Sequence, residues 1–128
     1  MAGELEAVAR QMLAAVDRND AEGIMRVAAD DIVGIDEISR RWLRGRAAVG
    51  EYVRQLVTAV QDVRSELRDV QEAVWGDVGL VTCWLEQDYT LEGKRQHVSA
   101  PTSVVLRREG AAWRVVLFHS IPLPEAGA

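Results

Sequence analysis

The sequence predicts one α+β domain, in which three N-terminal helices pack on a strongly curved, mainly antiparallel sheet. Apolar residues recur at helical spacing in the first part of the chain, whereas from Val63 onward they follow a period of two. Glycine follows glutamate at Glu92-Gly93 and Glu109-Gly110, where a tight hairpin turn is favoured. With 128 residues there is room for a single domain, residues 1–128.

Three helices are predicted before the long strands. The first has an apolar stripe on one face, formed by Leu5, Val8, Ala9, Met12, Leu13 and Val16. Asn19 and Glu22 have the spacing of a capping box at the start of a second, shorter helix. The third is expected from about Arg46 to Gln61, because the apolar residues in this range share one helical face.

Two short strands and three long ones are expected around and after the third helix. Residues 30–36 form a short apolar run that ends at Asp36, and Trp42–Gly45 is a brief second strand. From Val63 the chain is rich in β-forming residues, with long antiparallel strands at about 78–91, 94–108 and 111–121.

A two-residue turn at Glu92-Gly93 determines which residues of the first two long strands lie opposite each other. Counting outward places the following pairs on one face: Tyr89 with Gln96, Gln87 with Val98, Leu85 with Ala100, and Cys83 with Thr102. The same count from Glu109-Gly110 pairs His119 with Ala100 and so puts His119 on that face. We expect the helices to cover this more apolar face, and a slip of one residue in either turn would exchange the two faces.

Composition and charge exclude several classes of function. The net charge of −5 disfavours binding to nucleic acid and to anionic membranes. There is no signal-peptide pattern and no apolar run long enough to cross a membrane, so a cytoplasmic location is expected. Cys83 is the only cysteine, which excludes an intrachain disulfide and a zinc–thiolate cluster. We expect Cys83 to be a small buried residue and no metal to be bound.

Three segments resemble the SnoaL-like branch of the nuclear-transport-factor-two-like superfamily. They are Trp42-Leu-Arg-Gly-Arg-Ala-Ala-Val, Val104-Val-Leu-Arg-Arg-Glu-Gly and Trp113-Arg-Val-Val-Leu-Phe-His119-Ser. The resemblance covers nearly the whole chain and implies a cone-shaped roll with an internal pocket, commonly paired into a homodimer through the outer sheet face. The superfamily includes polyketide cyclases, ketosteroid isomerases, scytalone-type dehydratases, limonene-type epoxide hydrolases and non-catalytic association domains, so its fold does not specify one activity.

The enzymes of this superfamily mostly use acid and base side chains in an apolar pocket, without a metal. The resemblance therefore implies cofactor-free acid–base catalysis of the isomerase, cyclase or dehydratase (lyase) type on a small apolar, cyclic or polyketide-like molecule. The paired-Asp-plus-Arg set of the epoxide hydrolases and the Tyr/Asp/Asp set of the isomerases are missing at the matching positions. A non-catalytic dimeric module that binds a ligand or mediates association is therefore the alternative.

Six residues are candidates for the site. The resemblance and the strand pattern make Asp36 and His119 the candidate catalytic residues, since an imidazole titrates near neutrality and burial raises the pKa of a carboxyl. The candidate substrate-binding residues are Trp42 as a flat wall, and Gln87, Tyr89 and Thr102 as polar contacts.

Each of these residues also has a purely structural interpretation. His119 can be a bonded core histidine, Asp36 a strand-end cap, and Trp42 a core anchor under the third helix. If the register is exchanged, Asp88 and His97 become the leading catalytic pair, whereas in the predicted register they form a solvated ion pair on the outer face. Trp84, also on the outer face, suits a dimer interface.

Overall fold

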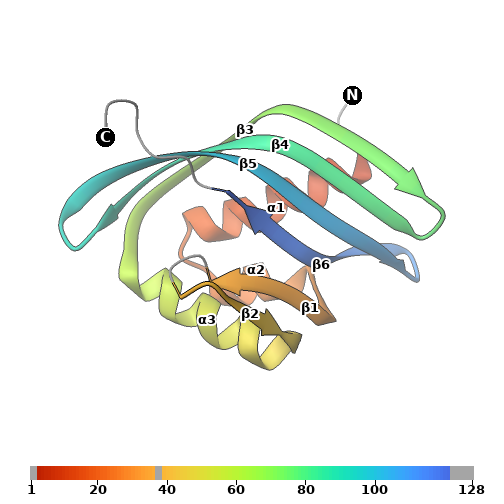
Figure 1. Ribbon diagram of the computed structural model, residues 1–128, viewed down its shortest axis with the longest axis horizontal. Coiled ribbons are helices and arrows are strands. Elements are labelled where there is room, and N and C mark those ends of the chain that lie inside the picture. Colours follow the sequence, from red (N-terminus) through yellow and green to blue (C-terminus); the bar gives the residue numbers. More distant parts are fainter. Residues whose placement is uncertain (1–2, 37–38, 122–128) are drawn as a thin grey trace.

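The computed structural model describes residues 3–36 and 39–121 as helices packed on one curved sheet (Figure 1). The helices are α1 (Glu4–Asp17), α2 (Ala21–Arg26) and α3 (Gly45–Ala59). The strands are β1 (Ala28–Asp36), β2 (Arg41–Arg44), β3 (Val60–Trp75), β4 (Val78–Leu91), β5 (Lys94–Glu109) and β6 (Ala112–Ser120). In the six-stranded sheet the order is β2-β1-β6-β5-β4-β3, and only β1 and β6 run parallel. This architecture confirms the predicted α+β class.

One face of the sheet packs against the helices, and we call it the inner face. Figure 1 shows β3, β4 and β5 arching over α1, with α3 beside β1 and β2. Leu5, Val81, Val104, Leu106 and Val115 are the largest fully buried side chains between these layers. Cys83 is buried as predicted, and burial raises the pKa of its thiol.

Helix α1 approaches the sheet closely at Gly79 of β4. A β-carbon at this position would lie 2.8 Å from both terminal methyl groups of Leu5. Leu5 is 1% exposed, so it has little room to move aside. The missing side chain of Gly79 is therefore what allows α1 to lie directly on β4.

The start of α2 differs from the prediction. Asp20, not Asn19, is the N-cap residue, and its Oδ1 accepts a hydrogen bond of 3.0 Å from the backbone N–H of Gly23. Asn19 has a left-handed backbone, with φ of 55°. Its side-chain amide donates to the carbonyl oxygens of Val57 (2.6 Å) and Val60 (2.7 Å). Asn19 therefore ties the α1–α2 connection to the junction between α3 and β3.

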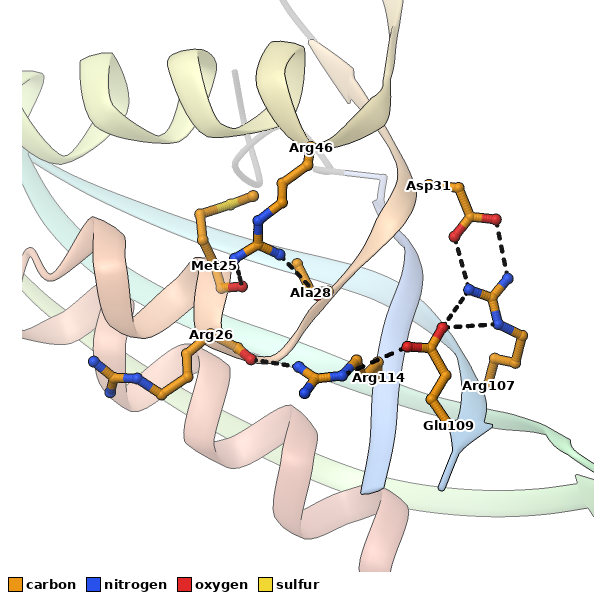
Figure 2. A network of polar contacts seen from close by, with 8 residues as sticks. All are labelled: Met25, Arg26, Ala28, Asp31, Arg46, Arg107, Glu109 and Arg114. Carbon is orange, nitrogen blue, oxygen red and sulfur yellow. Dashed lines mark hydrogen bonds and ion pairs between the residues drawn. The ribbon is translucent and has the colours of Figure 1, made fainter. Parts of the chain in front are cut away.

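Arginine side chains from α3 and β6 form hydrogen bonds with backbone carbonyl groups at the junction between α2 and β1 (Figure 2). Arg46 of α3 donates to the carbonyl oxygens of Met25 (2.8 Å) and Ala28 (2.9 Å), and Arg114 of β6 donates to that of Arg26 (2.8 Å). This contact gives Arg46, part of the segment that carries the family resemblance, a structural role. It holds the N-terminus of α3 against the α2–β1 junction.

A second arginine contact in Figure 2 joins β1 to β5. Arg107 donates to both carboxylate oxygens of Asp31, at 3.0 and 2.8 Å, and also pairs with Glu109. Hydrogen bonding to Arg107 holds the pKa of Asp31 below its usual range. These contacts lie at the surface, so they position the strands more than they stabilise them.

The predicted register of the β4–β5 hairpin is confirmed. Leu91 pairs with Lys94, Gln87 with Val98, and Cys83 with Thr102. Leu85 and Ala100 are buried under the helices, so this row belongs to the inner face. Asp88 and His97 pair on the opposite face, which we call the outer face.

The predicted register of the β5–β6 hairpin is wrong. Glu109 pairs with Ala112, so the turn is Gly110-Ala111, and Gly110 has the positive φ, 63°. A bulge at Val116 then shifts the register, because Leu106 faces Val115 whereas Val105 faces Leu117. His119 consequently lies opposite Ser103 on the outer face and not opposite Ala100 on the inner face.

Candidate functional site

The inner face is covered along only part of the β4–β5 hairpin. Inner-facing residues of β4 are buried as far as Leu85, and from Gln87 onward they are half-exposed. The same change occurs on β5 between Ala100 and Val98. We call the half-exposed part the open end; it consists of Gln87, Tyr89, Leu91, Gln96 and Val98.

A hollow of about 380 Å³ lies beside the open end, where α3 gives way to β3. It is lined by Ala59, Gln61, Thr90, Leu91, Glu92 and Gly93. Leu91 belongs to both the hollow and the open end. Gln61 and Thr90 pair with each other on the outer face, so the hollow lies at the tip of the β4–β5 hairpin and meets the open end at Leu91.

The amide of Gln87 is held in place by two residues from other elements. Gln87 Nε2 donates to Ser65 Oγ of β3 at 2.9 Å. Ser65 in turn donates through its hydroxyl to Asp17 Oδ1 (2.7 Å) and through its backbone N–H to Asp17 Oδ2 (3.0 Å). All three side chains are half-buried. The end of α1, β3 and β4 thus meet in one polar chain that fixes a predicted site residue.

Asp17 and Ser65 were not predicted as site residues, although the sequence carries a signal for each. Asp17 follows Leu5, Ala9 and Leu13 at steps of four, so a carboxylate lies on the apolar stripe of α1. Ser65 stands between Val63 and Leu67 in the alternation of β3. In both cases the informative feature is a polar residue at a position where the pattern requires an apolar one.

Thr102 is on the inner face as predicted but is buried and internally bonded. Its hydroxyl donates to the carbonyl oxygen of Ala100 (3.1 Å) and lies 2.8 Å from Ser120 Oγ. A hydroxyl has one proton, so Ser120 is the donor of the second bond. Thr102 is 3% exposed and therefore has a structural role in joining β5 to β6.

Asp36 lies at the end of β1, on the inner face. Its neighbours at alternate positions, Ile32 and Gly34, face the helices: Ile32 is buried in the core, and a β-carbon on Gly34 would lie 3.7 Å from Val49 of α3. Asp36 is half-buried and accepts a long hydrogen bond of 3.4 Å from the backbone N–H of Ser39. Both a strand-end cap and a pocket-facing carboxylate agree with this placement.

His119 and Trp42 lie on the outer face, away from the other four candidates. His119 borders a hollow of about 300 Å³ together with Trp84, Pro101 and Ser103. Trp42 pairs with Ile35, which faces the opposite way from Asp36, and it is 52% exposed beside Arg44. The predicted inner-face position of His119 is therefore wrong. Trp42, predicted as a flat wall of the site, lies on the other face, and the alternative of a core anchor under α3 is also wrong because Trp42 is exposed.

The other predicted pair, Asp88 and His97, also lies on the outer face. His97 Nδ1 is 2.8 Å from Asp88 Oδ1, and His97 Nε2 is 3.2 Å from Glu86 Oε1. Hydrogen bonding to Asp88, with a smaller contribution from Glu86, raises the pKa of His97. Glu86 also accepts from the hydroxyl of Ser99 (2.6 Å), which is the main reason why its pKa is lowered.

The described residues lack two kinds of feature. Residues 3–36 and 39–121 contain no group of three or more His, Cys, Asp or Glu side chains that could hold a metal ion. None of the described helices is long and apolar enough to cross a membrane.

Comparison with known proteins adds the family to this geometry. The SnoaL-like domain matches residues 5–124. The chain belongs to the SnoaL-like family. Curated protein sequences give no match to it.

Solved structures with the same fold carry different names. A candidate dehydratase of the nuclear-transport-factor-two-like family from Streptomyces avermitilis is 19% identical, with a TM-score of 0.84 over 95% of this chain and 96% of that one. A ketosteroid isomerase-like protein from Erwinia carotovora is 20% identical, with a TM-score of 0.82 over 95% of each chain. A candidate calcium/calmodulin-dependent protein kinase type II association domain from Thiobacillus denitrificans is 27% identical, with a TM-score of 0.76 over 93% and 94%. These similarities establish the nuclear-transport-factor-two-like fold but do not distinguish catalysis from binding.

Proposed function

We propose that this SnoaL-like protein binds a small, largely apolar molecule at the open end of its inner face. The observation that carries the proposal is the change along β4 and β5 from buried to half-exposed side chains on the inner face. The half-exposed residues include both apolar and polar side chains, which a ligand could contact. Val98, Leu91 and the ring of Tyr89 offer apolar surface, and Gln87 offers one anchored polar group. Ligand sites of proteins commonly combine an apolar wall with a few fixed polar groups.

This proposal is tested by following backbone amide signals in NMR spectra while 2-naphthol is added. Signals of Gln87, Tyr89 and Val98 should shift, and Val98→Arg should abolish the shifts. Val74→Arg is the control, because Val74 is an exposed valine of β3 that pairs with Gly79, away from both the open end and the outer face. Shifts confined to outer-face residues would contradict the proposal.

Acid–base catalysis by Asp36 is a second candidate function, favoured by its half-buried position on the inner face. Two structural relatives are named as a candidate dehydratase and as ketosteroid isomerase-like. In this proposal Asp36 alone moves the proton, since His119 lies on the other face of the sheet. Loss of a general base lowers turnover by about a hundredfold or more.

The catalytic candidate is tested with β,γ-unsaturated cyclic ketones and cyclic β-hydroxyketones as substrates for isomerisation and dehydration. Asp36→Asn should remove turnover, whereas Asp30→Asn, which changes an exposed carboxylate of the same strand, should retain it. His119→Ala should also retain it. Binding without turnover in the unaltered protein would leave the ligand-binding proposal and refute the catalytic one.

We also propose that a second copy of the chain covers the outer face, forming a homodimer. None of the described helices packs on this face, and its centre is apolar, with Trp84, Pro101, Val105 and Leu117 half-buried. Acidic Glu86 and Asp88 lie toward one end of this area, and Arg107 and Arg114 toward the other. Arg107 already pairs with Asp31 and Glu109, and Glu86 with Arg68 and His97, so the apolar centre and not charge complementarity supports the dimer.

Sedimentation equilibrium tests the dimer. Trp84→Arg should produce a monomer at micromolar concentration, because it would place two charges at the centre of the interface. Val74→Arg is the control: Val74 is 51% exposed, and it pairs with Gly79, away from the outer face. A monomeric unaltered protein would refute this arrangement.

A further inference from the structure

We infer that Gln87 presents its carbonyl oxygen to the open end, so that the site selects ligands with a hydroxyl or N–H group over ligands with a carbonyl group. This inference deepens the proposed binding function and rests on it. It follows from counting protons along the chain of Asp17, Ser65 and Gln87, and it needs no assumption about the identity of the ligand.

The first step concerns the hydroxyl proton of Ser65. Asp17 receives two bonds from Ser65: Oδ1 from the hydroxyl at 2.7 Å and Oδ2 from the backbone N–H at 3.0 Å. A carboxylate has no proton to donate, so the serine must be the donor in both bonds. The only hydroxyl proton of Ser65 is therefore committed to Asp17.

The second step concerns the amide of Gln87. With its proton committed, Ser65 Oγ can only accept in its contact of 2.9 Å with Gln87. The amide group facing it must then be the nitrogen, because two acceptors would repel each other. The carboxylate of Asp17 thus determines, through Ser65, which end of the Gln87 amide points toward β3.

The third step concerns the groups that remain for a ligand. Gln87 Oε1 has no hydrogen-bond partner among residues 3–36 and 39–121. Gln87 pairs with Val98 on the half-exposed inner face, with Tyr89 two residues further along the strand. A ligand hydroxyl or N–H can donate to Oε1, whereas a ligand carbonyl oxygen would have to reach the second Nε2–H, at the end of the amide that is turned toward β3. A preference of roughly three- to tenfold for the donor is expected from one neutral hydrogen bond.

The test compares 2-tetralol and 2-tetralone, which are nearly equal in size and differ in one polar group. Calorimetric titration of the unaltered protein should show tighter binding of the alcohol. Asp17→Asn should remove or invert this preference: the new amide at position 17 can donate to Ser65 Oγ, which frees the serine proton for Gln87 Oε1. The Gln87 nitrogen would then face the ligand and favour the ketone.

Two further variants make the comparison specific. Ser65→Ala frees the Gln87 amide to rotate and should reduce the preference toward equal binding. Asp30→Asn, the matched surface change, should keep the preference of the unaltered protein. Circular dichroism and thermal unfolding of each variant establish that the fold is retained. Equal binding of both molecules by the unaltered protein, or an unchanged preference in Asp17→Asn, would overturn the inference.

A ligand-free measurement separates this inference from the proposed binding function. In NMR spectra the side-chain amide protons of Gln87 should show nuclear Overhauser contacts to the β-protons of Ser65, and Asp17→Asn should weaken them. If neither tetralol nor tetralone binds, the binding proposal fails for this class of molecule. The amide contacts then still decide the orientation of Gln87: contacts to Ser65 support it, and their absence overturns it.

Discussion

Replacing Asn19 with aspartate changes one donor into an acceptor at nearly constant shape. In the structure the Asn19 amide donates to the carbonyl oxygens of Val57 and Val60, at 2.6 and 2.7 Å. Val57 belongs to the last turn of α3, where carbonyl groups lack partners within the helix. Two neutral hydrogen bonds contribute about 1–3 kcal/mol together. Asn19→Asp should cost more than this, because a carboxylate would face two carbonyl oxygens.

Two further substitutions separate the hydrogen bonds from the backbone conformation. Asn19 has a φ of 55°, which glycine adopts freely and alanine does not. Asn19→Gly should therefore lose only the bonds, about 1–3 kcal/mol, and Asn19→Ala should lose about 1 kcal/mol more. The expected order of stability is Gly above Ala above Asp.

Urea denaturation followed by circular dichroism measures these free energies of unfolding. Gln11→Glu serves as the control, since it makes the same change from amide to carboxylate at an exposed position of α1. If Asn19→Asp were as stable as the unaltered protein, the two hydrogen bonds of Asn19 would not contribute to stability. If the Ala and Gly variants were equally stable, the left-handed backbone at this position would carry no cost.

Other predictions concern packing, charge and pH. Gly79→Ala should lower the free energy of unfolding by about 1–3 kcal/mol in thermal denaturation, because the added methyl group meets buried Leu5 at 2.8 Å; an unchanged melting temperature would contradict this close approach. The pKa of His97 is raised in the folded state, so its contribution is complete below the ordinary histidine pKa and is lost as pH rises through the raised value. The free energy of unfolding, measured between about pH 6 and about pH 9, should therefore fall as the pH rises, and His97→Gln should remove this fall. The same dependence on pH in the unaltered protein and in the variant would contradict the prediction. Arg46→Met should destabilise by about 1–3 kcal/mol in urea, since two carbonyl oxygens at the α2–β1 junction lose a charged donor; Arg54→Met is the exposed control.

The two hairpins show what local sequence can and cannot predict. At Glu92-Gly93 the flanking strands alternate clearly, and the predicted pairs from Leu91–Lys94 to Cys83–Thr102 all occur. Around the second turn the chain reads Val115-Val-Leu-Phe118, where every residue is apolar. Such a run has no period of two, so it gives no sign of the bulge at Val116.

The predicted site residues are placed correctly or wrongly according to the hairpin on which each prediction depends. Gln87, Tyr89 and Thr102 depend only on the first hairpin, and all three are on the predicted face. The placement of His119 depended on the second turn and on the absence of a bulge, and it is wrong. Contacts between distant segments, such as Asp17 with Ser65, depend on how α1 lies across β3. The periodicity within one segment carries no information about this packing.

One inserted residue has consequences for the choice between the two candidate functions. Without the bulge at Val116, alternation would place His119 on the inner face, together with Asp36 and Gln87. With the bulge, Phe118 and Ser120 face inward, and the hydroxyl of Ser120 donates its proton to Thr102. The inner face then offers the half-buried carboxylate of Asp36 and the oriented amide of Gln87, whereas both imidazoles of the chain, His97 and His119, lie on the outer face. A site of this composition can bind and orient an apolar ligand that carries one hydrogen-bond donor. The proposed proton transfer by Asp36 would have no imidazole partner on the same face, which is why binding is the stronger of the two proposals.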